Sequence, residues 1–156
     1  MSSAQAAQTG CGAQRECIRV AVGVILDVDA DRVLLARRPG HVHQGGLWEF
    51  PGGKLEPGED ELQALERELG EEIGITVLRS EPLIEIAHDY ADKSVLLHVH
   101  LVREVSGKPE GREGQPLRWV GIDELHTISL PQANGAIVEA LQSPKLMSRA
   151  RRSPLA

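Results

Sequence analysis

The feature that most constrains this chain is an acidic segment with helical spacing between Glu56 and Glu72. Eight of the 23 acidic residues in the chain fall in this segment, together with one basic residue, Arg67. Apolar residues recur in it at intervals of three and four, which predicts an amphipathic helix from Glu59 to Ile73 that stops at Gly74. The apolar positions are Leu62, Leu65, Leu69 and Ile73.

Three of these acids form a cluster beside the apolar stripe. At about 100° per residue, Glu68, Glu71 and Glu72 project into one sector of about 100°. Each like-charge pair costs about 0.2–0.5 kcal/mol, and Gly70 in the helix interior adds about 1 kcal/mol relative to Ala. A ligand that compensates this cost is expected, and Mg²⁺ or Mn²⁺ suits carboxylate oxygens. The alternative is a solvated acidic face that binds nothing.

The spacing around the helix favours the metal site over the solvated face. Gly53 is followed by five residues, Glu59, seven residues, and then Arg67-Glu68-Leu69-Gly70-Glu71-Glu72-Ile73-Gly74-Ile75. This pattern resembles the Nudix box without a mismatch, and so many specified positions make a chance match improbable. The resemblance implies a loop–helix–loop that binds Mg²⁺ or Mn²⁺ and hydrolyses a nucleoside diphosphate joined to another group.

The resemblance also implies which residues bind the metal. Glu68, Glu71 and Glu72 would hold the cations, with Glu68 as the base that deprotonates the attacking water. The carbonyl group of Gly52 would be a further ligand. Bound metal ions would screen the phosphate charge and lower the pKa of that water.

Other motif residues are expected to be structural. Arg67 would pair with Glu59 and hold the loop against the helix. Gly53 permits a tight turn of the backbone before the helix, and Gly74 ends the helix.

Beyond the box, from about Ile18 to Leu141, the chain is similar to the MutT-like branch, which acts on oxidised nucleotides. The similarity rests on Trp48-Glu49-Phe50-Pro51-Gly52-Gly53-Lys54, Glu113-Gly114-Gln115-Pro116 and Pro131-Gln132-Ala133-Asn134. It implies that Glu113 supplies another metal-site carboxylate from a mobile loop that closes over the substrate. A plain exposed loop acid is the alternative for Glu113.

The same similarity implies a binding site for the nucleotide. Asn134 would read the oxidised purine, because an amide offers a donor and an acceptor together. The Phe50 backbone and the Arg38 side chain would surround the base and phosphate, and His43 would contact phosphate. Capping of the closing helix is the alternative role for Asn134.

Two His-x-His pairs raise the question of zinc. They are His41/His43 and His98/His100, and neither is accompanied by a cysteine. Zinc needs three or four converging ligands, so we interpret His98 and His100 as partly buried residues on one face of a strand. In a relative of this family, large aromatic residues stand at these two positions and Arg stands in place of Lys93.

The remaining pattern predicts an α+β fold, a mixed α/β/α sandwich in which a mixed sheet lies between helices. Residues 17–29 and 32–38 are expected to pair as a hairpin. The other expected strands are 48–50, stopped by Pro51-Gly52-Gly53, then 81–90, 94–104 and 117–120. A helical turn starts at Asp123, and a closing helix spans Pro131 to Gln142.

Composition limits the partners and the location. The 156 residues fit one domain at 17–142, between a disordered tail at 1–16 and a basic, flexible tail at 143–156. A net charge of −6 argues against stable duplex nucleic-acid binding, and 3% aromatic residues argue against single-strand stacking. The chain has no signal peptide and no run long enough to span a membrane, so we expect a cytoplasmic monomer whose partner is a nucleotide.

These observations predict a Mg²⁺-dependent nucleoside triphosphate pyrophosphohydrolase that prefers 8-oxo-dGTP and releases pyrophosphate and a nucleoside monophosphate. Two alternatives stay open. One is a Nudix hydrolase for an unmodified dNTP, a dinucleoside polyphosphate, ADP-ribose or a capped RNA end. The other is a non-hydrolytic nucleotide sensor, against which the intact Glu68, Glu71 and Glu72 argue.

Overall fold

The computed structural model describes residues 16–38 and 46–143. The two predicted tails lie outside these residues except for Glu16 and Ser143, and the candidate phosphate contact His43 also lies outside them. No helix within the described ranges is long and apolar enough to cross a membrane.

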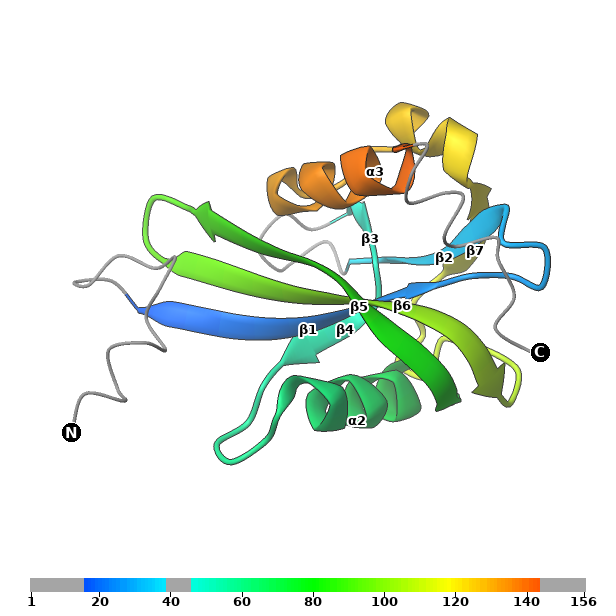
Figure 1. Cartoon of the computed structure of the whole chain (residues 1–156), viewed down its shortest axis with the longest axis horizontal. Helices are drawn as coiled ribbons and strands as arrows, with labels where there is room; N and C mark the ends of the chain where they lie inside the picture. Colours follow the sequence, from blue (N-terminus) through cyan, green and yellow to red (C-terminus); the bar gives the residue numbers. More distant parts are fainter. Residues whose placement is uncertain (1–15, 39–45, 144–156) are drawn as a thin grey trace.

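A four-stranded mixed sheet forms the centre of the molecule (Figure 1). Its strand order is β4-β1-β6-β5, in which β1 runs parallel to β6 and the other neighbours are antiparallel. The strands are β1 (Cys17–Ile25), β4 (Gly52–Lys54), β5 (Thr76–Asp89) and β6 (Ser94–Ser106). The sequence correctly predicted the long β5 and β6 pair, but β5 begins five residues before the expected Glu81.

A second sheet has the order β3-β2-β7, with β2 (Arg32–Arg37) between β3 (Trp48–Glu49) and β7 (Leu117–Gly121). The predicted hairpin of β1 with β2 is therefore wrong. The two strands join at a tight turn and share one isolated bridge, Leu26 to Val33, before they enter different sheets. Local sequence detects the turn, but the longer pairings with β6 and β7 determine which sheet each strand enters.

Two cores lie on opposite faces of the central sheet. The long helix α2 (Glu61–Ile73) covers one face through its buried residues Ala64, Leu65, Leu69 and Ile73. The short helix α3 (Gly135–Leu141) and the turns η1 (Ile122–Thr127) and η2 (Gln132–Asn134) lie on the other side with the small sheet (Figure 1). The expected α+β class, a mixed sheet between helices, is confirmed.

The ends of α2 follow the predicted signals closely. Asp60 is the N-cap, and its carboxylate accepts from the Gln63 amide while the Gln63 side chain accepts from the Asp60 amide. Gly74, with φ 72°, ends the helix in the left-handed region. The helix therefore begins two residues after the expected Glu59.

The predicted apolar stripe was partly wrong. Leu62, in the first turn, is 41% exposed, whereas Ala64 is fully buried. The sheet-facing side of α2 is thus shifted toward Ala64, and this shift turns Glu68 and Glu72 partly into the interior.

The expected stop at Pro51-Gly52-Gly53 was also wrong in detail. Gly52, Gly53 and Lys54 form strand β4, which pairs antiparallel with Val20, Ala21 and Val22 of β1. The closing helix is interrupted too, because it consists of η2 followed by α3.

Candidate active site

The two glycines of β4 are required by close packing. Gly52 has φ 157°, and a Cβ there would overlap the Ala21 carbonyl oxygen. A Cβ on Gly53 would overlap the carboxylate of Glu68. The glycines therefore let β4 lie against β1 and leave room for the Glu68 side chain over the strand.

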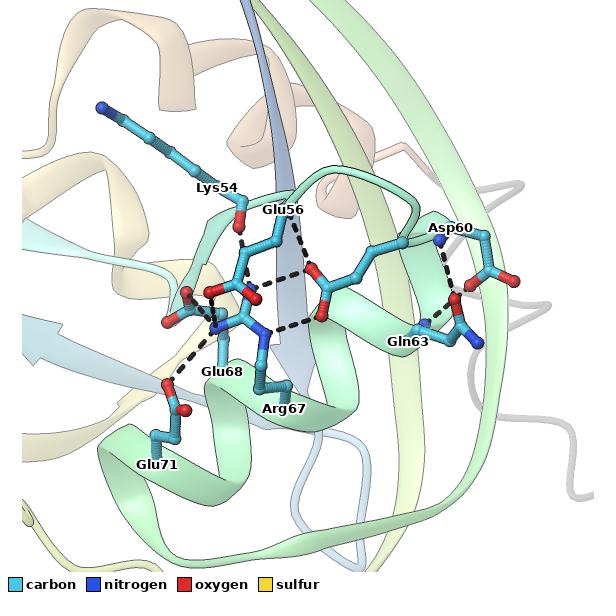
Figure 2. Close-up of polar contacts among 8 residues, drawn as sticks. Lys54, Glu56, Asp60, Gln63, Arg67, Glu68 and Glu71 are labelled. Atoms are coloured by element: carbon cyan, nitrogen blue, oxygen red, sulfur yellow. Dashed lines mark hydrogen bonds and ion pairs between the residues drawn. The ribbon is translucent and has the colours of Figure 1, made fainter.

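Arg67 joins the loop before α2 to the helix itself (Figure 2). Its Nε donates to Glu59 Oε2 at 2.7 Å, and its Nη2 donates to Glu59 Oε1 at 3.0 Å. The same Nη2 donates to the Lys54 carbonyl oxygen at 3.0 Å. The predicted pair with Glu59 is present, as a bidentate contact that fixes the loop.

The other guanidinium nitrogen of Arg67 contacts two predicted metal ligands. Nη1 lies 3.0 Å from Glu68 Oε2 and 3.3 Å from Glu71 Oε1. Glu71 is the more exposed of the two, with 60% of its side chain accessible against 16% for Glu68. Glu71 thus lies at the rim of the acidic cluster.

The pKa values of Glu59 and Arg67 show that opposite charges stabilise each other on the loop side of the motif. The Arg67 hydrogen bonds hold the pKa of Glu59 at about 2, with a further contribution from the Glu56 backbone. The pKa of Arg67 is raised above its usual value in return, chiefly by Glu59. The loop side of the motif therefore contains a cation that keeps Glu59 ionised.

Glu72 experiences the opposite environment. Burial, a hydrogen bond with Glu68 and the charges of Glu68, Glu49 and Glu113 raise its pKa to about 9. Glu68, Glu49 and Glu113 therefore each lie close enough to Glu72 to disfavour its ionised form. Such a set of hard oxygen donors, with too little positive charge around it, fits a divalent cation.

The loop that carries Glu113 is bound to the C-terminal end of α2. The backbone amide of Arg112 and the Gln115 side-chain amide both donate to the Glu72 carbonyl oxygen, each at 2.9 Å. Gln115 Oε1 also accepts from the Glu113 amide at 2.8 Å. One side chain thus links the backbones of two predicted metal ligands and satisfies a terminal carbonyl group of the helix.

Glu49 is a site residue that the sequence analysis did not single out. Its Oε1 lies 2.7 Å from Arg38 Nη1, and its charge acts on Glu72. Burial raises the pKa of Glu49, and Arg38 offsets this only in part. The Trp48-Glu49-Phe50 segment contained the signal, but the proximity to Glu72 comes from tertiary packing.

A cavity of about 210 Å³ opens beside β4. Gly52 and Gly53 line one side of it, and Arg38, Lys93 and Asn134 line others. Its further lining includes Ile18, Val20, Tyr90, Val95 and Leu97. The cavity thus brings the predicted purine reader and the glycines of the motif to one space.

Asn134 does not cap the closing helix. Its side chain makes no capping hydrogen bond, although it stands at the first position before α3. It is 8% exposed, and its Oδ1 has no hydrogen-bond partner among residues 16–38 and 46–143. A buried acceptor of this kind is costly unless a ligand supplies a donor.

Phe50 and Arg38 are the remaining predicted contacts within the described residues. The Phe50 side chain is 3% exposed and packs in the core, and contact of its backbone with the base stays a prediction. Arg38 also lines a second cavity of about 300 Å³, together with Glu113. Arg38 therefore borders both the Asn134 cavity and the Glu113 loop.

The histidines of β6 do not line the cavity beside β4. His98 and His100 are 3% and 5% exposed, more buried than expected, and neither is among the residues that line the cavity. His100 instead contacts Glu61 of α2, so both side chains point to the opposite face of the sheet from Leu97. A larger cavity of about 840 Å³, lined by Asp31, Asp123 and Glu124 among others, contains none of the motif residues.

A glycine-lined loop followed by a helix with clustered carboxylates is typical of hydrolases that act on phosphoanhydrides with divalent metal ions. Residues 21–140 match the NUDIX domain family model, and the chain belongs to the Nudix family. Members of this family typically depend on divalent metal ions. The chain is accordingly an enzyme of the Nudix pyrophosphohydrolase type.

Its relatives include enzymes with different substrates. An Escherichia coli 8-oxo-dGTP diphosphatase is 34% identical over 125 residues, which cover 80% of this chain and 96% of that protein. An Escherichia coli CTP pyrophosphohydrolase is 36% identical over 122 residues, 78% of this chain and 90% of that one. A MutT structure, from work on Aliivibrio salmonicida and Vibrio cholerae, superposes with a TM-score of 0.71 at 36% identity, covering 86% of this chain and 99% of that one.

Proposed function

We propose that this chain is a Mg²⁺-dependent nucleoside triphosphate pyrophosphohydrolase of the MutT type that acts on 8-oxo-dGTP. One observation carries the proposal: a single cavity is lined by Gly52 and Gly53 of the motif and by Asn134, whose buried Oδ1 has no partner among the described residues. A base recognised by Asn134 would extend its phosphates toward the carboxylates of α2.

The donor set fits a hard cation. Glu68, Glu72 and Glu113 supply carboxylate oxygens, Glu71 extends the set at the rim, and the Gly52 carbonyl is the remaining candidate ligand. Gly53 leaves the space that the Glu68 carboxylate occupies. Mg²⁺ or Mn²⁺ bound there would screen the phosphate charge and lower the pKa of the attacking water.

Each residue of the site would then have a separate role in hydrolysis. Glu68 accepts a proton from water, whose oxygen bonds to the β-phosphorus while the bridge between the α- and β-phosphates breaks. The bridging oxygen leaves with the nucleoside monophosphate, and pyrophosphate carries the new oxygen. Arg67 and Glu59 position α2, and Arg38, held by Glu49, lies between the base cavity and the Glu113 loop.

Asn134 would supply the preference for the oxidised base. The N7 atom of guanine is an acceptor, whereas N7 of 8-oxoguanine carries a hydrogen and donates. The unpartnered Oδ1 can accept from that hydrogen but would face a lone pair in guanine. A buried mismatch costs about 1–3 kcal/mol, enough for ten- to hundredfold discrimination.

A second candidate substrate is CTP. The Escherichia coli relative that is a CTP pyrophosphohydrolase is as similar as the 8-oxo-dGTP diphosphatase. The exocyclic amino group of cytosine could also donate a hydrogen bond to Asn134 Oδ1. A smaller pyrimidine would fill less of the cavity, which favours the purine.

We further infer that the enzyme acts as a monomer in the cytoplasm, with a nucleotide as its partner. The proposed role, removal of oxidised guanine from the nucleotide pool, belongs to the compartment in which DNA precursors are made.

The test compares kcat/KM for 8-oxo-dGTP, dGTP and CTP in wild type and in Asn134→Ala. Gln132→Ala, an exposed amide in the same η2 turn, is the matched control. We expect Asn134→Ala to lower kcat/KM for 8-oxo-dGTP at least about tenfold more than for dGTP, and Gln132→Ala to change neither. An equal loss on both substrates would refute recognition by Asn134. A wild-type preference for CTP would refute 8-oxo-dGTP as the substrate and favour CTP instead.

A further inference from the structure

The two histidines of β6 belong to a polar cluster beneath the N-terminal end of α2. His98 Nδ1 lies 3.0 Å from Glu61 Oε2 and 3.0 Å from Glu85 Oε2. Glu61 is the first residue of α2, and Glu85 lies on β5, so three elements converge on one imidazole nitrogen. We propose that Glu61, Glu85 and His98 form a second metal site, specific for Zn²⁺ or a similar transition metal ion.

The spacing of the donor atoms suits such an ion. The nearest atoms of the three residues all lie within 4.8 Å of one another. Tetrahedral zinc with bonds of about 2.1 Å holds its ligands roughly 3.4 Å apart, so small side-chain movements complete the geometry. Glu85 has 63% of its side chain exposed, which leaves the site open to entry from solvent.

His100 orients one of the ligands. Its Nε2 lies 2.8 Å from Glu61 Oε1, the oxygen that does not contact His98. Its Nδ1 is buried and has no partner in the part of the chain that the structure describes, so Nε2 carries the hydrogen and donates to Glu61. An imidazole that fixes a ligating carboxylate is a common outer partner of protein metal sites.

The hydrogen bonds of His98 show which of its ring nitrogens faces the two carboxylates. Arg19 Nε donates to His98 Nε2 at 3.1 Å, so His98 carries its hydrogen on Nδ1, facing the two carboxylates. The charged groups around His98 are thus Arg19 from β1, Glu61 from α2 and Glu85 from β5. A metal ion would displace that hydrogen, and the exposed Arg19 side chain would turn away as Nε2 becomes the protonated nitrogen.

This site is separate from the carboxylates of the Nudix motif. Glu61 and Glu68 are seven residues apart on α2, which corresponds to about 10 Å along the helix. Imidazole is a softer ligand than carboxylate and favours Zn²⁺ over Mg²⁺. Zn²⁺ here would tie the N-terminal end of the catalytic helix to β5 and β6, and would stabilise the fold by mass action.

The test measures Zn²⁺ binding to the full chain by titration calorimetry, with excess Mg²⁺ present to saturate the Nudix carboxylates. It requires no turnover, so its outcome is independent of the proposed substrate. The variants are Glu85→Gln and His98→Gln, with Glu104→Gln on β6 as an exposed, charge-matched control. Thermal melts check that each variant folds, and Glu85→Gln alters only an exposed side chain in case His98→Gln does not fold.

We expect one Zn²⁺ per chain in wild type and in Glu104→Gln, and binding weaker by at least about tenfold in Glu85→Gln and His98→Gln. Arg19→Met should bind Zn²⁺ more tightly than wild type, because it removes the donor that competes for His98 Nε2. No Zn²⁺ binding in wild type, or equal affinity in wild type and Glu85→Gln, would overturn the proposal. Unchanged affinity in Arg19→Met would refute the displacement of the proton.

Discussion

Glu59 and Glu72 belong to the same motif and have the same side chain, but their surroundings drive their ionisation in opposite directions. Arg67 holds the pKa of Glu59 at about 2, whereas burial and neighbouring carboxylates raise that of Glu72 to about 9. The loop side of the motif therefore contains its own counter-charge. On the cavity side Arg38 and Arg67 compensate Glu49 and Glu68 only in part, because the pKa of Glu72 is still raised, and this is where a bound cation would be stabilising.

This difference separates folding from chemistry within one short motif. Residues around Arg67 fix the loop to α2 and should control stability. Residues around Glu72 repel one another and should control activity. The predictions below test that division.

The largest effect should come from removal of the divalent ion. In excess chelator we expect loss of nearly all hydrolysis, because the cavity-side carboxylates repel the substrate phosphates when no cation is bound. Added Mg²⁺ or Mn²⁺ should restore the rate, and Zn²⁺ should restore it poorly, because the ligands are oxygen atoms. Initial rates of pyrophosphate release measure this, and full activity in chelator would contradict it.

Next in size is neutralisation of the cavity-side acids. Glu68→Gln and Glu72→Gln should each lower kcat by about 100-fold or more, as expected for loss of a base or a metal ligand. The exposed Glu66→Gln on the same helix is the control and should retain wild-type kcat. The variants should keep the wild-type circular dichroism spectrum. Retention of more than about a tenth of kcat in both site variants would exclude the carboxylate mechanism.

A smaller effect, on stability, should follow from the loop side. Arg67→Lys removes the bidentate contact to Glu59, the bond to the Lys54 carbonyl and the Nη1 contacts to Glu68 and Glu71. We expect the free energy of unfolding to fall by about 1–3 kcal/mol, measured by urea denaturation. Glu71→Gln breaks only a rim contact to the same arginine and should cost less than about 1 kcal/mol. Equal losses in the two variants would remove the distinction between the bidentate contact and the rim.

The sequence predicted best those features that depend on neighbouring residues. The end of α2 at Gly74 and the pair of Arg67 with Glu59 follow from helix signals and motif spacing. The predicted hairpin is wrong because the strands that pair with β1 and β2 are distant in sequence. The predicted burial of Leu62 is wrong because the orientation of α2 depends on its packing against the sheet.

The candidate site shows the same limit. Gly52, Gly53 and Asn134 could be selected from motifs, and the structure brings them to one cavity. The proximity of Glu49 to Glu72, and of Glu85 to His98, joins segments more than ten residues apart. Those contacts arise from sheet register and helix packing, which a single sequence does not encode in any local pattern.

The most direct measurement of the central claim is the stability of metal-free protein against pH, in wild type and in Glu72→Gln. A carboxyl group with a raised pKa keeps its proton in the folded state while the unfolded chain releases it, so stability falls as pH rises from about 4.5 to about 9. We therefore expect the melting temperature of wild type to fall relative to that of Glu72→Gln across this window, and Mg²⁺ to reverse the fall. If the melting temperatures of the two proteins differ by the same amount at all pH values, with or without Mg²⁺, the account is contradicted. Repulsion among the cavity-side carboxylates would then not be what a cation relieves.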